Sequence, residues 1–340
     1  MFLIQHNDLS HARFLDLLGP LRAYMDDSSV LNINVNENGD IWLERRGGKR
    51  ERAPERVTQG GRESIIAFLA NKAGRAVDPL NSRLSCDMPY YDARVQAFVP
   101  PVSNYPIMVR RHAEHVHTLN DYVEAGTMTA SARDAIAQGI ADEKNIVVAG
   151  RMGSGKTTLL NACMHEAAKR RPLNRCVIVQ DRAELKASAD NHLYLFARVE
   201  QGRWTGGNLV RYIYNFPDLL EDALRTDAQY LVWGELRDGL SALGLMMALN
   251  TGTRGFLTTI HADNARDTLY RIEDLLASVG KVPQPRSIAR SIHLIVHMDR
   301  DESNGKRFVR EVVELSGLDE HGRYLFTSMN AEGGDENERV

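Results

Sequence analysis

The sequence has few cysteines, no long apolar run and almost no excess of charge of one sign. Its three cysteines, Cys86, Cys163 and Cys176, are far apart and form no Cys-x-x-Cys pair, which fits a reducing compartment and argues against a structural zinc site. No apolar run approaches the roughly 18–20 residues of a membrane-spanning helix. The N-terminus lacks a basic segment followed by a long apolar one, so no signal peptide is expected.

The charges nearly cancel, because 42 Lys and Arg stand against 45 Asp and Glu, a net charge of −3. This balance gives no support for a basic nucleic-acid-binding protein. With 43% hydrophobic and 26% charged residues, the chain has the composition of a globular protein. Its 340 residues predict two domains. The basic stretch 44–56 is interpreted as a solvated hairpin tip or loop, with a lipid or partner patch as the alternative.

The pattern of apolar residues predicts α/β structure throughout. Early in the chain, Leu31, Ile33 and Val35 alternate with asparagines, which predicts a half-buried strand in a hairpin. From Asn145 onward, short apolar runs without alternation predict strands of a mainly parallel sheet, at 146–149, 176–179 and 230–233. We therefore expect an N-terminal domain at 1–111, a linker at 112–130, a second domain at 131–330 and a polar tail at 331–340.

One segment carries the clearest chemistry. Gly150, Gly155, Lys156 and Thr157 match the phosphate-loop pattern G-x-x-x-x-G-K-[ST], between a predicted strand and a predicted helix. Glycines let backbone N–H groups curl around a phosphate, and the helix directs its positive end at the anion. Lysine reaches the β- and γ-phosphates, and the threonine hydroxyl binds Mg²⁺. The predicted ATP-binding residues are Gly150, Gly153, Ser154, Gly155, Lys156, Thr157 and Thr158.

Three later segments offer groups for hydrolysis, which needs a water-positioning residue and a phosphate sensor. Asp181 and Glu184 follow the strand at 176–180, Glu235 ends the strand at 230–234, and His261 follows 257–260. Polar groups at the carboxyl ends of such strands lie where ligands bind. Each residue taken alone has an ordinary structural alternative, a surface acid or a core histidine. Thr157 and Asp181 are the candidate Mg²⁺ ligands.

The four segments in this order resemble the Walker A, Asp box, Walker B and His box of the secretion ATPase superfamily, which serves type II secretion, type IV pili and type IV secretion. Residues 119–129 and 30–43 are similar to the TrbB-type conjugal-transfer ATPases within it. The resemblance covers about residues 15–325. Two departures are notable: Gln180 stands where the family usually has an acid, and Gly234 stands where an Asp usually precedes the Walker B Glu.

The resemblance implies a PAS-like N-terminal domain and a RecA-like P-loop domain, with nucleotide bound between them in a hexameric ring. It assigns Glu184 and Glu235 as catalytic carboxylates and His261 as the sensor. It also places two arginines of the N-terminal domain, Arg94 and Arg110, at the phosphates. On sequence alone, Arg94 and Arg110 would be surface residues, and only the resemblance gives them a role.

The function implied is an ATP- and Mg²⁺-dependent motor that energises a type IV secretion or conjugal-transfer apparatus. Its partners would be further copies of itself and inner-membrane components of that machine, without direct contact with nucleic acid. We expect a cytoplasmic protein peripheral to the inner membrane. Two alternatives stay open: a type IV pilus assembly or retraction ATPase, and a nucleotide-gated scaffold with little turnover.

Overall fold

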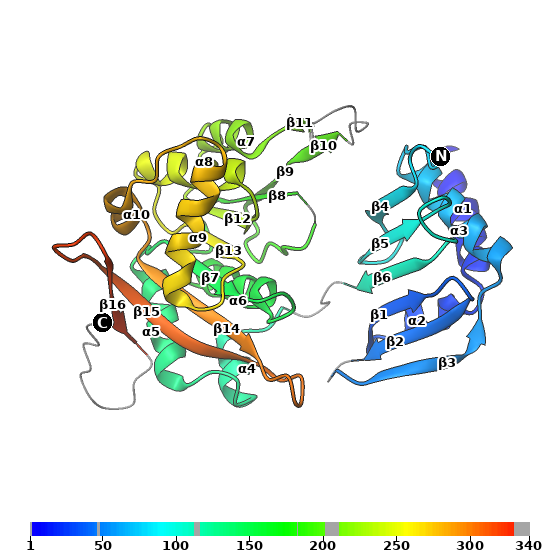
Figure 1. Cartoon of the computed structure of the whole chain (residues 1–340), viewed down its shortest axis with the longest axis horizontal. Coiled ribbons are helices and arrows are strands. Elements are labelled where there is room, and N and C mark those ends of the chain that lie inside the picture. Colours follow the sequence, from blue (N-terminus) through cyan, green and yellow to red (C-terminus); the bar gives the residue numbers. More distant parts are fainter. Residues whose placement is uncertain (1, 46–47, 112–115, 182, 201–210, 330–340) are drawn as a thin grey trace. The chain divides into compact units, whose positions relative to one another are not determined.

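The computed structural model describes residues 2–45, 48–111, 116–181, 183–200 and 211–329. The chain forms two compact units, Met1–Glu114 and His115–Val340, and each is described by itself (Figure 1). The role of 112–130 as a linker stays a prediction. Its described part holds helix α4 (Leu119–Glu124), which packs against helices of the second unit. The predicted polar tail, 331–340, lies outside the described residues.

The first unit is a PAS-like α/β domain built on a six-stranded antiparallel sheet in the order β3-β2-β1-β6-β5-β4. Three helices, α1 (Phe2–Leu18), α2 (Leu21–Asp26) and α3 (Gln59–Lys72), supply the apolar side chains that pack with the sheet. The strands are β1 (Val30–Val35), β2 (Asp40–Arg45), β3 (Arg50–Arg56), β4 (Arg83–Asp87), β5 (Ala93–Phe98) and β6 (Ile107–Arg111).

The predicted strand at 31–35 is present, but its buried face begins one residue earlier. Val30 is fully buried together with Ile33 and Val35, whereas Leu31 is only partly buried. The cause is a shift in the pairing with β2 between Val30 and Asn32, which inserts one extra residue into β1. The prediction that Leu31 shares the core face was therefore wrong, because alternation read from sequence assumes an uninterrupted strand.

The basic stretch 44–56 contains an edge strand, β3, and is more than a solvated loop. Much of its positive charge is paired inside the unit. Arg45 contacts Asp27 at 2.6 Å. Arg52 and Arg56 both contact Asp40, at 2.9 and 2.6 Å. These pairs leave less free charge for an external patch than the composition of the stretch indicates.

The second unit contains an eight-stranded sheet in the order β16-β15-β14-β7-β13-β12-β8-β9. The strands from β14 to β9 are parallel, and β15 and β16 are antiparallel. The P-loop strand β7 thus has β14 on one side and β13 on the other, the RecA-like arrangement. The strands are β7 (Ile146–Gly150), β8 (Cys176–Gln180), β9 (His192–Phe196), β12 (Tyr230–Leu236), β13 (Leu257–Ile260), β14 (Leu294–Arg300), β15 (Arg307–Leu318) and β16 (Tyr324–Ser328).

Helices cover both faces of this sheet (Figure 1). One face packs with α4, α5 (Ala130–Ala141) and α6 (Lys156–Arg170). The other packs with α7 (Phe216–Leu224), α8 (Gly239–Asn250), α9 (Ala265–Ser278) and α10 (Pro285–Ser291). This double cover explains why the central strands are apolar without alternation, as predicted. A short ribbon, β10 (Arg198–Glu200) with β11 (Arg211–Tyr214), completes the unit.

No helix among the described residues has the length and apolar character needed to cross a membrane.

The packing of α8 on the sheet gives a stability prediction. Trp233 is fully buried, and a Cβ added at Gly244 would lie 2.9 Å from its Cζ2 atom. In Gly244→Ala, overpacking should outweigh the gain in helix propensity and lower the free energy of unfolding by about 1 kcal/mol or more. Urea denaturation followed by circular dichroism measures this. Met247→Ala, on the same helix but 46% exposed, is the control; an equal or larger loss in it would contradict the packing argument.

Candidate nucleotide-binding site

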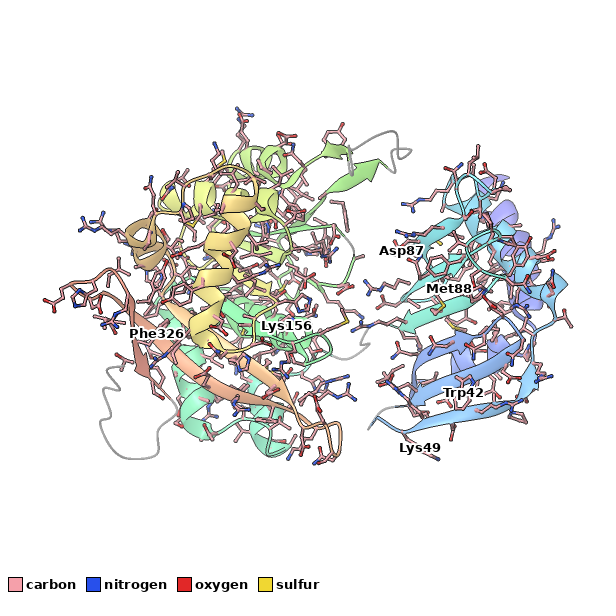
Figure 2. All side chains as sticks on the ribbon, viewed as in Figure 1. Trp42, Lys49, Asp87, Met88, Lys156 and Phe326 are labelled. Atoms are coloured by element: carbon pink, nitrogen blue, oxygen red, sulfur yellow. The ribbon has the colours of Figure 1, made fainter. Side chains whose placement is uncertain are left out.

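The phosphate loop has the predicted strand–loop–helix form. Fully buried β7 ends at Gly150, and α6 begins at Lys156, labelled in Figure 2. Gly150, Gly153 and Gly155 have φ values of 149°, 76° and 98°, which L-residues rarely adopt. A Cβ at Gly150 would lie 2.3 Å from the carbonyl oxygen of Met298. Glycine is therefore required here by both conformation and space.

The loop offers unused groups to an anion. The hydroxyl of Ser154 is buried and has no hydrogen-bond partner among the described residues. Helix α6 starts without a side-chain cap, because its N-cap residue is Gly155. Thr157 and Thr158 lie in the first turn of α6. Backbone N–H groups at such a helix start, together with its dipole, favour a bound phosphate. The residues present thus fit the phosphates of a nucleotide.

Three residues from three separate segments meet at the loop. Lys156 Nζ lies 3.0 Å from His261 Nδ1 and donates to the carbonyl oxygen of Arg151 at 3.0 Å. On the other side of the imidazole ring, Nε2 lies 2.9 Å from Glu235 Oε1. With its proton on Nε2, His261 accepts from the lysine and donates to the carboxylate. A continuous path of polar contacts therefore runs from the P-loop lysine to the acid at the end of β12.

Arg237 extends this path and had no role in the sequence prediction. Its guanidinium contacts Glu235 Oε2 at 2.7 Å and Asp181 Oδ2 at 2.8 Å, so it bridges two carboxylates. Burial alone would raise the pKa of Glu235, but hydrogen bonds from His261 and Arg237 outweigh it and lower that pKa to about 2. Glu235 is thus held as a carboxylate. Only the fold, which brings Asp181 beside β12, reveals the bridge.

The segment after β8 is shaped by Gln180, the residue that departs from the family pattern. Gln180 is buried, and its Oε1 accepts the backbone N–H groups of Glu184 at 3.1 Å and Leu185 at 3.0 Å. Burial lowers the pKa of Arg237, but the charges of Asp181 and Glu184, with those of Glu235, raise it overall. Glu184 therefore belongs to the same electrostatic cluster as Asp181, Arg237 and Glu235.

Gly234, the other departure, is explained by close packing of neighbouring strands. A Cβ at position 234 would lie 3.1 Å from Gln180 Cβ and 3.5 Å from its Cα. Strand β12 pairs with β8 up to Trp233 and Val179, so positions 234 and 180 follow side by side. An acid at 234 would press against β8. This strand therefore offers Glu235, without a preceding Asp, to the site.

A metal ion would have oxygen ligands here. Thr157 and Asp181 supply a hydroxyl and a carboxylate, the ligand types that suit Mg²⁺. Across the described residues, no group of three or more His, Cys, Asp or Glu side chains gathers to hold a metal.

Arg94 and Arg110 belong to the first unit, where they are direct neighbours. They are paired across strands β5 and β6. Their alternating neighbours Val95 and Val109 are buried in the core of the unit, so the two arginines share the opposite face of the sheet. Asn32 pairs with Arg110, and Asp87 pairs with Arg94, in the same row. That Arg94 and Arg110 are adjacent follows from the pairing of β5 with β6 and could not be inferred from their spacing along the chain.

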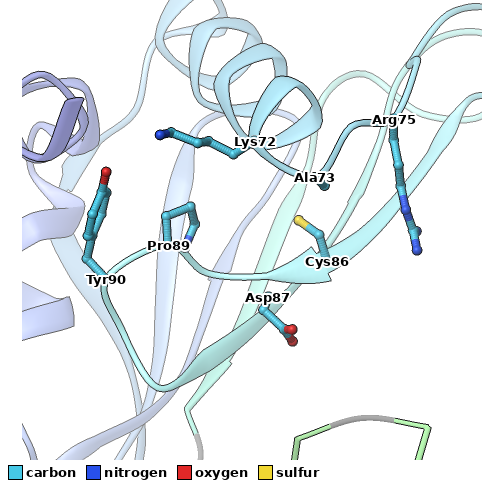
Figure 3. A pocket seen from close by; sticks show the side chains of 7 residues that line it. All are labelled: Lys72, Ala73, Arg75, Cys86, Asp87, Pro89 and Tyr90. Atoms are coloured by element: carbon cyan, nitrogen blue, oxygen red, sulfur yellow. The ribbon is translucent and has the colours of Figure 1, made fainter. Parts of the chain in front are cut away.

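A separate recess in the first unit is lined by Lys72, Arg75, Cys86 and Tyr90, among others (Figure 3). Burial raises the pKa of the Cys86 thiol to about 11, so the thiol is protonated near neutral pH and is a poor nucleophile. Arg75 is already bound to the backbone carbonyl of Ser85.

A P-loop on a parallel sheet, with a carboxylate and a histidine at the ends of adjacent strands, defines the second unit as a RecA-like P-loop NTPase domain. Residues 71–331 match the family described as "Type II/IV secretion system protein", and the chain belongs to this family. The resemblance found in the four segments is thereby confirmed.

Two relatives cover nearly the whole chain. A probable conjugal transfer protein TrbB of Sinorhizobium fredii is 33% identical over 307 residues, covering 89% of this chain and 88% of that protein. The conjugal transfer protein TrbB of Rhizobium radiobacter is 33% identical over 316 residues, covering 91% and 92%. The pilus retraction motor PilT with bound ADP shares the fold, with a TM-score of 0.62 at 15% identity, covering 90% of this chain and 84% of PilT.

The bridge at Arg237 gives a pH prediction. A depressed pKa means that Glu235 contributes stability above its unfolded value of 4.5, and that this contribution is lost as the pH falls towards about 2. Arg237→Ala removes part of the contribution. The difference in thermal midpoint between Arg237→Ala and wild type should therefore be largest above about pH 5. This difference should become smaller as the pH is lowered towards 3.

Arg225→Ala is the matched control, because Arg225 and its partner Glu221 are 69% and 66% exposed. Such exposed pairs contribute little, so its midpoint should follow that of wild type at every pH. A gap for Arg237→Ala that stays constant with pH would contradict the assigned electrostatic role.

Proposed function

We propose that the chain is a Mg²⁺-dependent ATPase whose hydrolysis energises a type IV secretion or conjugal-transfer apparatus. The observation that carries the proposal is the path Lys156–His261–Glu235, in which the three side chains to which we assign phosphate binding, sensing and water positioning contact one another. Membership of the secretion family and the 33% identity with two conjugal transfer proteins support the system. The likeness to a pilus retraction motor, at 15% identity, supports only the fold.

Each group has a role that its surroundings support. The P-loop residues Gly150 to Thr158 bind the phosphates, with Lys156 at the β- and γ-phosphates. Glu235, charged and hydrogen-bonded by His261, orients the attacking water. His261 reports the γ-phosphate, since it already contacts Lys156 at 3.0 Å. Glu184 adds a second carboxylate to the cluster.

Mg²⁺, when bound, neutralises charge that develops on the phosphates. Thr157 and Asp181 are the residues that would hold it. Arg94 and Arg110, a pair on one sheet face, would act as cationic groups on the phosphates, a contribution worth roughly 10³–10⁵ in rate in other NTPases. We propose that they reach the nucleotide when the first unit closes over it in a hexameric ring.

We further propose that the partners are inner-membrane components of the secretion machine, and that the protein is cytoplasmic and peripheral to that membrane. The net charge of −3 favours protein contacts over direct binding of nucleic acid. In this scheme hydrolysis moves the first units of the ring against the RecA-like units. The alternative of a nucleotide-gated scaffold differs in one respect, because secretion would continue without turnover.

Two variants test the assignment of the site. Lys156→Ala should bind ATP weakly and show no turnover, because it removes the cation at the phosphates. Glu235→Gln should retain ATP binding but lose hydrolysis by about 10²-fold or more, because only the water-positioning group is changed. Phosphate release and binding of a fluorescent ATP analogue measure the two effects. Lys169→Ala, in the last turn of α6, is the control, and wild-type turnover in Lys156→Ala would refute the proposal.

The assembly is tested by negative-stain microscopy of the Glu235→Gln protein with ATP and Mg²⁺. A six-fold ring is expected, since trapped ATP keeps the first unit closed over the site. The same protein without nucleotide is the comparison. A persistent monomer under both conditions would contradict the ring and the proposed role of Arg94 and Arg110 within it.

A further inference from the structure

Two arginines face each other at the end of the β14–β15 hairpin. Arg300 and Arg307 are cross-strand partners. Like charges directly opposite each other destabilise a sheet, so the position calls for a compensating feature. Elsewhere on this hairpin, Asp299 is bound by Arg310 at 2.6 Å, and Asp301 is bound by Ser303 and Asn304 within the turn.

Both arginines lie against the phosphate loop. Arg307 Nε donates to the carbonyl oxygen of Gly153 at 2.8 Å. A Cβ at Gly155 would lie 3.3 Å from Arg307 Cδ, and a Cβ at Gly153 would lie 3.8 Å from Arg300 Nη1. The glycines thus bring the loop backbone close to two guanidinium groups.

In the described part of the chain, no carboxylate lies within ion-pair distance of the Arg300 guanidinium, although Asp299, Asp301 and Glu302 are on the same hairpin. Its guanidinium also lies close to the turn of the hairpin, since a Cβ at Gly305 would be 3.4 Å from Arg300 Nη2. An unpaired cation beside a loop that offers backbone N–H groups adds to the positive potential there. The combination favours an anion at this point.

The order of the strands decides which end of that anion the arginines face. Strand β13, which leads to His261, and β12, which carries Glu235, lie on one side of β7. The β14–β15 hairpin lies on the other side. The two arginines therefore flank the loop opposite the residues proposed to act at the γ-phosphate.

We propose that Arg300 and Arg307 together bind a phosphate of the nucleotide. The phosphate they bind is the one nearest the ribose, at the end of the phosphate chain that lies away from His261. This inference rests on the proposed nucleotide binding by the P-loop. Guanidinium groups suit the task because they present several N–H donors in a plane that matches phosphate oxygens. Arg307 also fixes the loop through Gly153, so Arg300 is the cleaner reporter of ligand contact.

The pair predicts that the loss of affinity depends on the presence of the phosphate nearest the ribose. Arg300→Gln should weaken ADP and ATP binding by about tenfold or more, the size expected for a lost charged hydrogen bond. AMP should be weakened by a similar factor, and adenosine should not change. Arg300→Lys should recover part of the loss, because it keeps the charge. Isothermal titration calorimetry with the full-length chain gives each Kd.

Arg310→Gln is the control, because it removes a charge from the same hairpin but from an arginine bound to Asp299. Thermal midpoints show whether each variant is folded. The test uses Arg300→Gln and no variant of Arg307, because Arg307 holds Gly153, whereas the Arg300 side chain donates none of the hydrogen bonds found among the described residues.

Three results would overturn the pair as a phosphate site: wild-type ADP affinity in folded Arg300→Gln, an equal loss in Arg310→Gln, or an equal loss for adenosine. Failure of the proposed function is distinguishable, since wild type itself would then bind neither ADP nor ATP.

Discussion

The hydrogen bond between Lys156 and His261 joins residues 105 positions apart, and the proposed chemistry depends on it. It exists because β7 and β13 are parallel neighbours whose carboxyl ends coincide, Ala149 being paired with Ile260. The P-loop begins at one strand end and the histidine follows the other. Glu235 joins them from β12, the next strand in the sheet. Sheet order, rather than any single segment, therefore assembles the site.

A half-buried acid such as Glu235, at the end of strand β12, needs a nearby positive charge or hydrogen-bond donors to stay ionised. Here each oxygen of Glu235 has its own donor, His261 on one and Arg237 on the other. The Arg237 guanidinium also contacts Asp181, so one cation links the Asp box to the Walker B strand. At the other flank of the loop, Arg307 of the β14–β15 hairpin donates to the backbone carbonyl of Gly153.

The sequence was sufficient for the parts of the site that have fixed local spacing. The P-loop was identifiable because its glycines, lysine and flanking strand and helix are contiguous, and the apolar strands of the second unit followed from their double burial. Arg237 and Arg300 were not identifiable, since the folded sheet, and no local spacing, brings Asp181 beside Arg237 and the phosphate loop beside Arg300. The shift at Leu31 was missed for a related reason, because an inserted residue is defined by the neighbouring strand. The roles of Arg94 and Arg110 came from resemblance alone and stay a prediction.

The contact between positions 234 and 180 has a consequence for how this chain can evolve. The close approach at Gly234 is to the Cα and Cβ atoms of residue 180, which every residue except glycine shares with glutamine. A side chain at 234 therefore needs residue 180 to shift by a few tenths of an ångström, and the buried end of Gln180 is itself held by the backbone N–H groups of Glu184 and Leu185. A lineage carrying this sheet geometry could regain an acid at 180 in one step. An acid at 234 would in addition press against residue 180 of the neighbouring strand.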